Sequence, residues 1–263
     1  MIPWTHLGTA QVPDGGELRL MRRGTEFSIK LDKNELMNSR LSATEQALAT
    51  MACDKLRDRA RPTILIGGLG MGFTLRAALA VLGEHARIVI AELVPEVVAW
   101  ARGPMAKLFG DSLSDPRVAI RETDVGELIR AAEAGYDAIL LDVDNGPNGI
   151  TRASNDRLYD RAGLAAAHAA LRPGGVLAVW SSAPDAKFTA RLRRGGFAVV
   201  ENPVRATGPQ GGAKHFIWTA TRDDGDAPAV VADGVRRGGK KQTGGRVVAT
   251  AARRSAAKSI KRR

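Results

Sequence analysis

The sequence contains one cysteine, Cys53, which excludes an intrachain disulfide and any metal site built from several thiolates. It has no apolar run near the ~18 residues that span a bilayer. Residues 1–8 lack the basic start and the apolar stretch of a secretory signal. No metal is expected, because the four histidines are scattered without the spacing of metal ligands. The absence of a GxSxG motif argues against a serine hydrolase. Together these absences predict a cytoplasmic protein that does not contact membranes.

Positive charge is unevenly distributed. The formal net charge is +11, of which residues 223–263 carry +7. Residues 1–222 therefore carry a net charge of only +4, which is ordinary for a globular domain. The terminal segment is rich in glycine, alanine and arginine and has few large apolar side chains, so it cannot bury enough surface to offset its ordering entropy. We expect a disordered basic tail. Contact of this tail with nucleic acid would be non-specific and salt-sensitive, because it has no aromatic rings to stack on bases, and a solubilising role is favoured.

The start of the chain predicts a small β element followed by a helix. Residues 17–23 and 26–32 carry alternating apolar residues around Gly24, a hairpin pattern. Residues 42–57 repeat apolar residues at helical spacing, and Ser42 with Glu45 has the pattern of a capping box. The predicted division is a β-hairpin element over 1–40, a nucleoside-binding domain over 41–222 and the tail over 223–263.

From residue 63 onward strand patterns alternate with helix patterns. This alternation predicts an α/β fold with a doubly wound, Rossmann-like, mostly parallel seven-stranded sheet. Helices are expected at 74–82, 95–108 and about 156–171, the last one stopped by the sequence Pro173-Gly174-Gly175. The expected strands are 63–66, 87–92, 118–121, 138–142, 176–180, 197–201 and 215–221, the last two as a closing hairpin.

A glycine-rich turn follows the first strand of this series, at residues 67–72. Glu92 closes the next strand about 20 residues later, the spacing that suits an adenosine ribose. Asp124 and Asp142 also lie at or just beyond strand ends, where Asp124 could take the adenine amine and Asp142 would face the reactive end. An NAD site is the closest competitor. The glycines are spaced GxGxG, and Phe73 stands where the dinucleotide fingerprint has its third glycine, which favours a mononucleoside.

Five sequence blocks follow one another along the chain. They are Ile64–Gly72, Ala91–Val98, Asp115–Val118, Tyr136–Asp142 and Leu171–Gly175. In this order the blocks resemble the spermidine synthase branch of the class I S-adenosylmethionine-dependent transferases. The resemblance covers roughly residues 17–222, and the ordered series is far more specific than any single block.

The resemblance implies a sulfonium nucleoside donor, either decarboxylated S-adenosylmethionine or S-adenosylmethionine itself. It implies an in-line displacement at the carbon beside the sulfur, with Asp142 as the proton acceptor for an attacking amine. Asp144 is favoured over Asn145 as a second acceptor-binding group, and Tyr159 is a secondary candidate for orienting the substrate through its hydroxyl. The expected donor contacts are Gly67, Gly68, Gly70, Gly72, Glu92, Leu93, Asp124 and Val125.

Three departures from the family pattern bear on the reaction. Gly70 stands where aminopropyltransferases usually carry an aspartate, which removes an anchor for the donor's aminopropyl amine. Ala43 and Thr44 precede Glu45, where the family has Tyr followed by His or Gln. The segment after Asp142 is shorter than in the family.

Three functions therefore stand as hypotheses. The first is aminopropyl transfer to a small amine acceptor, and the second is methyl transfer from S-adenosylmethionine. The third is non-specific nucleic-acid binding through the tail. Related synthases pair as homodimers, although the spacing of this chain does not itself indicate an interface.

Overall fold

The computed structural model describes the chain except for residues 1, 14, 144–145, 148–152, 209–210 and 224–263. The described residues fall in one unit, residues 1–229, and form a four-stranded sheet and a seven-stranded sheet. The basic tail predicted from residue 223 onward lies outside the described residues, apart from Asp223 itself.

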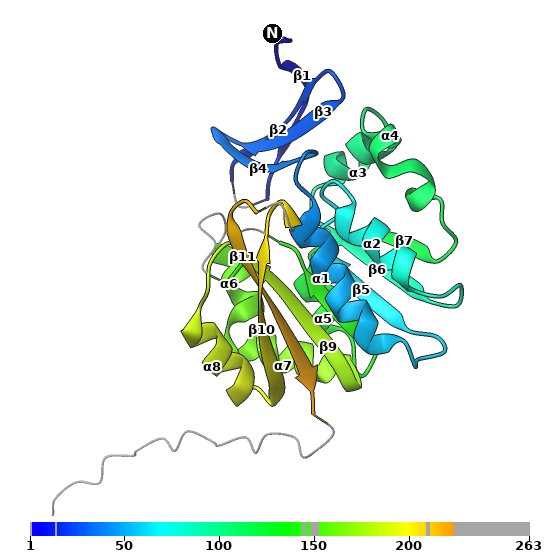
Figure 1. Cartoon of the computed structure of the whole chain (residues 1–263), viewed down its shortest axis with the longest axis vertical. Helices are drawn as coiled ribbons and strands as arrows, with labels where there is room; N and C mark the ends of the chain where they lie inside the picture. The colour runs from blue at the N-terminus through cyan, green and yellow to red at the C-terminus, as the bar shows by residue number, and fades with distance from the viewer. Residues whose placement is uncertain (1, 14, 144–145, 148–152, 209–210, 224–263) are drawn as a thin grey trace, which may run out of the picture. The chain divides into compact units, whose positions relative to one another are not determined.

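The smaller sheet is an antiparallel meander at the start of the chain (Figure 1). The predicted hairpin is confirmed as its two inner strands, which turn at Gly24, a residue with φ of +60°. One face of these strands is apolar, and Leu20 and Ile29 on it are almost fully buried in a cluster shared with the main domain. The four strands are β1 (Thr5–Gln11), β2 (Glu17–Arg23), β3 (Glu26–Leu31) and β4 (Asn34–Asn38).

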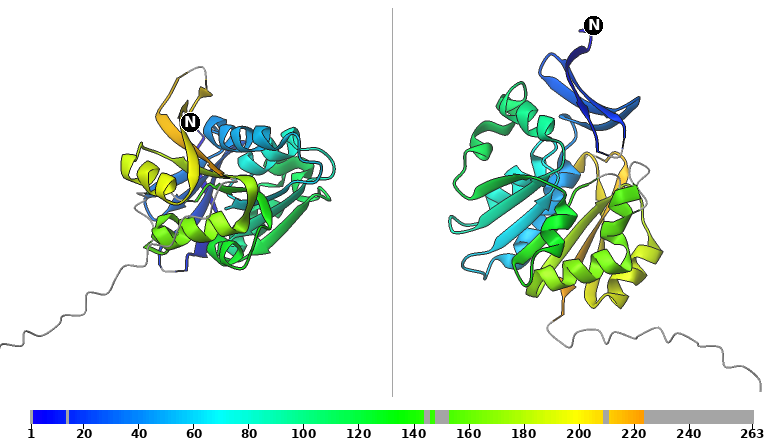
Figure 2. Two further views of the ribbon diagram at one scale, coloured as in Figure 1. Left: turned by 90° about the horizontal axis from the view of Figure 1, so that it is seen from below. Right: turned by 180° about the vertical axis from the view of Figure 1, so that it is seen from behind.

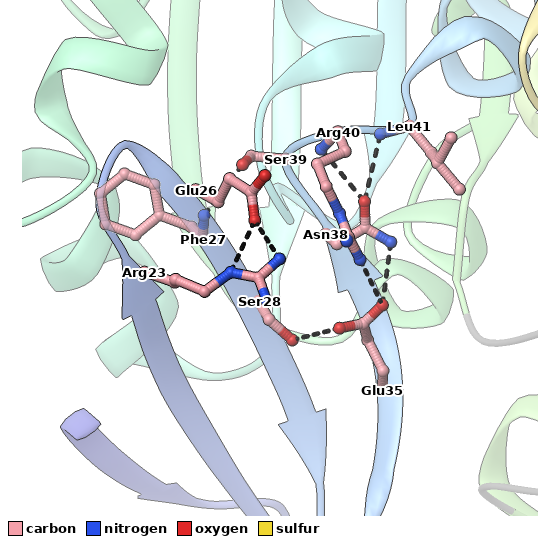
Figure 3. A network of polar contacts seen from close by, with 9 residues as sticks. All are labelled: Arg23, Glu26, Phe27, Ser28, Glu35, Asn38, Ser39, Arg40 and Leu41. Atoms are coloured by element: carbon pink, nitrogen blue, oxygen red, sulfur yellow. Dashed lines mark hydrogen bonds and ion pairs between the residues drawn. The ribbon is translucent and has the colours of Figure 1, made fainter. Parts of the chain in front are cut away.

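A polar network ties the smaller sheet to the chain that leads into the first helix (Figure 3). The Glu35 carboxylate accepts hydrogen bonds from Ser28 Oγ at 2.7 Å and Asn38 Nδ2 at 2.9 Å. The Asn38 Oδ1 in turn accepts from the backbone N–H groups of Arg40 at 3.0 Å and Leu41 at 3.1 Å. This network fixes the backbone just before the helix and therefore the place where the helix begins.

The larger sheet has the order β10-β11-β9-β8-β5-β6-β7, and β11 is its one antiparallel strand. The predicted seven-stranded, mostly parallel sheet is confirmed. Its central strands β5 and β8 are buried almost throughout because both faces are covered, whereas the edge strands β7 and β10 also carry exposed residues. The strands are β5 (Thr63–Gly67), β6 (Arg87–Glu92), β7 (Val118–Glu122), β8 (Tyr136–Leu141), β9 (Leu171–Ser181), β10 (Phe197–Arg205) and β11 (Lys214–Arg222).

Helices cover both faces of the sheet (Figures 1 and 2). Alternate side chains on one strand enter different clusters. Ile64 and Ile66 pack with the helices before and after β5, whereas Leu65 packs with helices of the second half of the domain. The first face carries α1 (Ala43–Cys53), η1 (Asp54–Leu56), α2 (Phe73–Val81), α3 (Pro95–Arg102), α4 (Ala106–Phe109) and η2 (Gly110–Leu113). The second carries α5 (Val125–Arg130), α6 (Ala153–Tyr159), α7 (Arg161–Ala170) and α8 (Ala186–Arg194).

Three local expectations were wrong. The helix expected over 95–108 is two helices, α3 and α4, because the first ends at Gly103. The helix expected over 156–171 is two helices separated at Asp160, because the Asp160 carboxylate accepts from Gly163 N at 2.7 Å and caps a new helix. The capping box at Ser42 does not form, since the Ser42 side chain makes no capping hydrogen bond. Glu45 instead accepts from Thr44 Oγ1 at 2.9 Å and lines a cavity.

Candidate active site

A cavity of about 210 Å³ lies at the carboxyl ends of β5, β6 and β8. In an open α/β sheet this edge is where ligands bind, because the loops that follow the strands diverge there. The smaller sheet and the turn after β1 supply an apolar wall. That wall consists of Val12, Leu18, Ile29, Leu31, Leu36 and Met37.

The glycine-rich turn after β5 forms the floor of the cavity. Gly68, Gly70 and Gly72 all have positive φ, at +87°, +49° and +73°. A Cβ at position 72 would overlap the ring of Phe109, and a Cβ at position 68 would lie 3.1 Å from the carbonyl oxygen of Asp142. The turn therefore needs glycine both for its backbone angles and for its close approach to neighbouring groups.

The Glu92 carboxylate lies between the glycine turn and the loop after β6. Its Oε2 accepts from Leu69 N at 2.9 Å and its Oε1 accepts from Val94 N at 2.9 Å. Glu92 is 7% exposed, and this burial raises the pKa of its carboxyl group against the opposing effect of the backbone hydrogen bonds. The backbone N–H groups of Gly70 and Leu93 also interact with the carboxylate, so both loops hold it at the cavity wall.

Asp124 lines the cavity from the end of the next strand. It occupies the N-cap position of α5, yet its side chain makes no capping hydrogen bond, and its Oδ1 lies 4.0 Å from Arg130 Nη2. Its oxygens are thus available as hydrogen-bond acceptors on the cavity side. Leu93 and Val125, which follow Glu92 and Asp124, line the cavity as well.

Asp142 and Glu45 meet at the cavity from different parts of the fold. Asp142 follows β8, and its Oδ2 accepts from Thr74 Oγ1 at 2.9 Å. Burial, together with repulsion from Glu45, raises the pKa of Asp142 to about 7, although the Thr74 hydrogen bond opposes this rise. Burial also raises the pKa of Glu45. Two carboxylates that repel each other in a poorly solvated place attract a cation.

The corner of the cavity next to Glu45 is closed by an aromatic pair. The Trp180 and His215 rings pack edge to face with centroids 4.9 Å apart, and Trp180 lines the cavity. The His215 Nδ1 lies 3.5 Å from Thr44 Oγ1, the hydroxyl that donates to Glu45. An indole face is also a favourable neighbour for a cation.

Three residues that the sequence proposed for the site lie elsewhere or outside the described part of the chain. Gly67 is buried within β5, where a Cβ would lie 3.1 Å from Val125 Cγ2. Tyr159 is 1% exposed in the core beneath the sheet, with its ring edge-on to Phe188 at 5.7 Å, and it does not line the cavity. Asp144 lies outside the described residues, as does Asn145.

Acidic side chains dominate the polar lining. Among the described residues that line the cavity, four are carboxylates and none is Lys, Arg or His. The described residues also hold no group of three or more His, Cys, Asp or Glu placed to bind a metal ion. Such a lining suits an organic cation. The four carboxylates are Glu45, Glu92, Asp124 and Asp142.

No family model matches the chain, but comparison with known proteins finds similar sequences and similar structures. The polyamine aminopropyltransferase of Mycobacterium tuberculosis (H37Rv) is 29% identical over 223 residues, covering 81% of this chain and 41% of that protein. Polyamine aminopropyltransferase 2 of Pseudomonas aeruginosa (PAO1) is 33% identical over 162 residues, covering 58% and 44%. Putrescine N-methyltransferase 3 of Nicotiana tabacum is 36% identical over 118 residues, covering 44% and 29%. The chain spans less than half the length of these curated relatives.

Solved structures agree on the fold. The spermidine synthase of Thermotoga maritima matches with a TM-score of 0.65 at 18% identity, covering 82% of this chain and 72% of that one. A spermidine synthase in complex with the transition-state analogue AdoDATO matches with a TM-score of 0.64 at 19% identity, with the same coverage. The chain thus shares the fold of these spermidine synthases. Its sequence is similar to those of polyamine aminopropyltransferases.

No helix in the described part of the chain is both long and apolar enough to cross a membrane.

Proposed function

We propose that the protein transfers an aminopropyl group from decarboxylated S-adenosylmethionine to a small amine. The observation that carries this proposal is the acidic lining of the cavity, in which the described residues present four carboxylates and no basic side chain. Donor and acceptor of this reaction are both cations, so the same lining attracts both by Coulomb forces. The names of the relatives, polyamine aminopropyltransferases, support the same reaction.

We assign the residue roles according to where the side chains lie around the cavity. Glu92 accepts hydrogen bonds from the ribose hydroxyls, and Asp124 accepts one from the adenine amine. The turn has no side chains at Gly68, Gly70 and Gly72, so the nucleoside can lie directly against its backbone. Asp142 holds the acceptor amine and takes one of its protons.

The reaction is a displacement in which a carbon–nitrogen bond forms as a carbon–sulfur bond breaks. An ammonium ion cannot attack, because its lone pair is occupied by a proton. Once Asp142 accepts that proton, the amine attacks the carbon next to the sulfonium sulfur and methylthioadenosine leaves as a neutral thioether. A carboxyl group with a pKa of about 7 is suited to accept the proton near neutral pH.

The acidic lining also favours a donor that lacks a carboxylate. S-Adenosylmethionine carries an α-carboxylate, and among the described lining residues no cationic side chain is present to pair with it. An unpaired carboxylate beside Glu45 and Asp142 would be repelled. The decarboxylated donor avoids this repulsion.

A direct assay tests the proposal. The purified chain is supplied with decarboxylated S-adenosylmethionine and putrescine, and methylthioadenosine and spermidine are measured by mass spectrometry. We expect both products in equal amounts from the unchanged chain and at least 100-fold less from Asp142→Asn. Absence of methylthioadenosine with the unchanged chain, at any acceptor concentration, would refute aminopropyl transfer.

Methyl transfer from S-adenosylmethionine is the second candidate. Gly70 favours it, because the residue carries no side chain to anchor an aminopropyl amine. The similarity to tobacco putrescine N-methyltransferase supports it as well. The same assay with S-adenosylmethionine distinguishes the two, since methyl transfer yields S-adenosylhomocysteine and N-methylputrescine instead.

Three further expectations from the sequence belong to this proposal. Two copies of the chain form a homodimer, which light scattering of the purified protein checks. The basic tail makes at most non-specific, salt-sensitive contact with nucleic acid, and deleting residues 223–263 leaves the transferase activity nearly intact. The protein works in the cytoplasm, which fractionation of cells expressing the tagged chain checks.

A further inference from the structure

Trp180 and Asp142 lie side by side at the carboxyl ends of neighbouring strands. The register of β8 and β9 pairs Leu141 with Val179, so Asp142 and Trp180 hold the next position on each chain. Leu141 and Val179 pack into the cluster on the second face of the sheet, whereas Asp142 and Trp180 both line the cavity. Neighbouring strands are about 4.8 Å apart, so the indole lies directly beside the carboxylate that is proposed to take the proton.

The cavity ends at Trp180 on this side of the sheet. In the strand order β9 lies between β8 and β11, and β5, β6 and β7 lie on the other side of β8. No described residue of β10 or β11 lines the cavity. Among the described lining residues that the larger sheet supplies, Trp180 is therefore the farthest along this edge from the glycine turn and Glu92.

The indole of Trp180 is held by packing and not by a hydrogen bond. Its ring meets the ring of His215 edge to face, with centroids 4.9 Å apart. Its buried Nε1 makes no hydrogen bond to any residue that the structure describes. Trp180 therefore contributes its size and its apolar surface to the cavity, and no polar contact depends on its N–H group.

The outer side of this ring pair faces solvent. Trp180 and His215 are both only half-buried, and Lys214, which precedes His215 on β11, is exposed. The indole thus separates the cavity from solvent at the end of β9.

The proposed reaction sets the direction in which the acceptor lies. In an in-line displacement the attacking nitrogen approaches the carbon from the side opposite the leaving sulfur. The nucleoside of the donor is assigned to the glycine turn and Glu92, at the ends of β5 and β6. The acceptor therefore extends from Asp142 away from these strands, and that direction leads to Trp180 at the end of β9.

We propose that Trp180 sets the length of the acceptor, because its indole is the end wall of the part of the cavity that holds the acceptor. The inference rests on the proposed function and extends it by assigning a residue that determines acceptor specificity. A short amine fits in front of the indole. A longer amine overlaps a ring that cannot move without losing its contact with His215, so it is excluded by short-range repulsion.

A smaller side chain at position 180 removes this limit. It opens the end of the cavity to solvent, and the far ammonium of a longer amine then extends into water. The second charge of such an amine is not buried, so the opened cavity accepts it without a desolvation cost.

Steady-state kinetics of the unchanged chain measures the length limit. Decarboxylated S-adenosylmethionine is held at saturation, and kcat/KM is measured for diaminopropane, putrescine, cadaverine and spermidine. We expect kcat/KM for spermidine to be at least about tenfold below that for putrescine, since overlap with a packed wall costs more than one kcal-scale contact in the transition state. Equal values of kcat/KM for spermidine and putrescine would overturn the inference, and this measurement does not depend on the folding of any variant.

Trp180→Leu tests the assignment of the wall. Leucine keeps an apolar side chain on the strand and removes most of the ring. We expect the ratio of kcat/KM for spermidine to that for putrescine to rise at least about tenfold, and the affinity for methylthioadenosine to stay within about twofold. Trp180→Phe keeps a ring against His215 and lacks only the N–H group and part of the size, so its ratio should stay within about threefold of that of the unchanged chain.

Phe216 gives the matched control. It is a half-buried aromatic residue of β11, next to His215, but it packs into the cluster on the second face of the sheet and does not line the cavity. Phe216→Leu should leave the ratio of the two kcat/KM values unchanged. Melting temperatures of the variants verify that they are folded.

The outcomes separate this inference from the proposed function. If the unchanged chain reacts with putrescine and Trp180→Leu has the same ratio as the unchanged chain, Trp180 does not set the acceptor length and the transferase proposal stands. If Trp180→Leu lowers kcat/KM equally for all four amines and weakens methylthioadenosine binding, the ring is only structural and the inference is refuted. If the unchanged chain forms no methylthioadenosine with any of the amines, the proposed function is wrong and this inference falls with it.

Discussion

Thr74, in the first turn of α2, donates its hydroxyl hydrogen to Asp142, which follows β8 at the centre of the sheet. The hydrogen bond stabilises the ionised form of Asp142 and so opposes the burial and the repulsion from Glu45 that raise its pKa. The acidity of the residue proposed to take the proton is therefore adjusted from a helix 68 residues earlier in the chain.

Replacing Thr74 with valine removes this hydrogen bond and keeps the shape of the side chain. We expect the pKa of Asp142 to rise further, so the acidic limb of the kcat/KM profile moves to higher pH by about one unit, because a hydrogen bond to a charged group contributes roughly 1.5 kcal/mol. The matched control is Thr74→Ser, which keeps the hydroxyl and the original limb. A valine variant with an unshifted profile would contradict the role of Thr74.

The raised pKa of Asp142 also makes a prediction about folding. A carboxyl group whose pKa is about 7 in the folded state and about 4 in the unfolded state binds more protons when folded, so its contribution to stability is lost as pH rises between these values. Asp142→Asn should therefore increase the free energy of unfolding at pH 8, by roughly 1–3 kcal/mol, and leave it unchanged below pH 4. Urea denaturation at several pH values measures this, and a variant less stable than the unchanged chain at pH 8 would contradict it.

The position of much of the candidate site could be predicted from the sequence, because it depends on local patterns. The glycine turn follows an apolar strand directly, and Glu92 and Asp124 come at the ends of the next two strands, where parallel topology brings side chains to one edge. The same rule covers Asp142. In each case a strand pattern of a few residues fixes the position of the residue that follows it.

Glu45 and Trp180 illustrate what the sequence could not give. The Ser42-x-x-Glu45 pattern indicates a capping box. In the structure the Glu45 carboxylate instead accepts a hydrogen bond from the Thr44 hydroxyl and faces the cavity. This arrangement depends on contacts made 97 positions away at Asp142. From the sequence, Trp180 is expected to be a core residue of a strand. In the structure it lies at the carboxyl end of β9 and therefore lines the cavity.

The outer strands of the smaller sheet were missed for another reason. β1 and β4 bury few side chains, so their apolar alternation is weak, and they are stabilised by pairing with β2 and β3. Leu36 and Met37, which close the cavity, belong to β4. Tyr159 was proposed for the site because it follows the loop after Asp142, but its ring is needed to fill the core against Phe188.

Glu92→Gln tests the proposed contact with the ribose. The amide offers one acceptor where the carboxylate has two, so either Leu69 N or Val94 N faces a donor instead of an acceptor. We expect methylthioadenosine to bind at least about tenfold more weakly, because hydrogen bonds to a charged acceptor contribute roughly 1.5–3 kcal/mol each. The control is Glu122→Gln on the exposed face of β7. Equal affinity of the unchanged chain and Glu92→Gln would show that Glu92 does not contact the nucleoside.

Replacing Asp137 should change the stability of the protein without changing substrate binding at the candidate site. It is 2% exposed at the start of β8 and accepts from Arg59 Nη1 at 2.6 Å, from Thr63 N at 2.7 Å and from Arg172. Asp137→Asn leaves both guanidinium groups without their carboxylate, which should lower the free energy of unfolding by about 2–4 kcal/mol. Because Asp137 lies at the opposite end of β8 from Asp142, the KM values should stay within about twofold of the unchanged chain. If Asp137→Asn weakened donor binding and left the free energy of unfolding unchanged, the prediction would be contradicted.

Gly70 offers a test of donor choice. A Cβ at this position would lie 3.2 Å from Met37 Sδ, a flexible side chain that can yield, and the φ of +49° is one that aspartate tolerates better than most residues. Gly70→Asp places a carboxylate at the wall near the donor's tail, so we expect the affinity for decarboxylated S-adenosylmethionine to rise relative to S-adenosylmethionine by about tenfold. Gly70→Asn has the same shape without the charge and should leave the ratio of the two affinities unchanged. Competition binding with both donors measures the ratio, and an equal change in both variants would mean that the effect is steric and that Gly70 does not control the choice of donor.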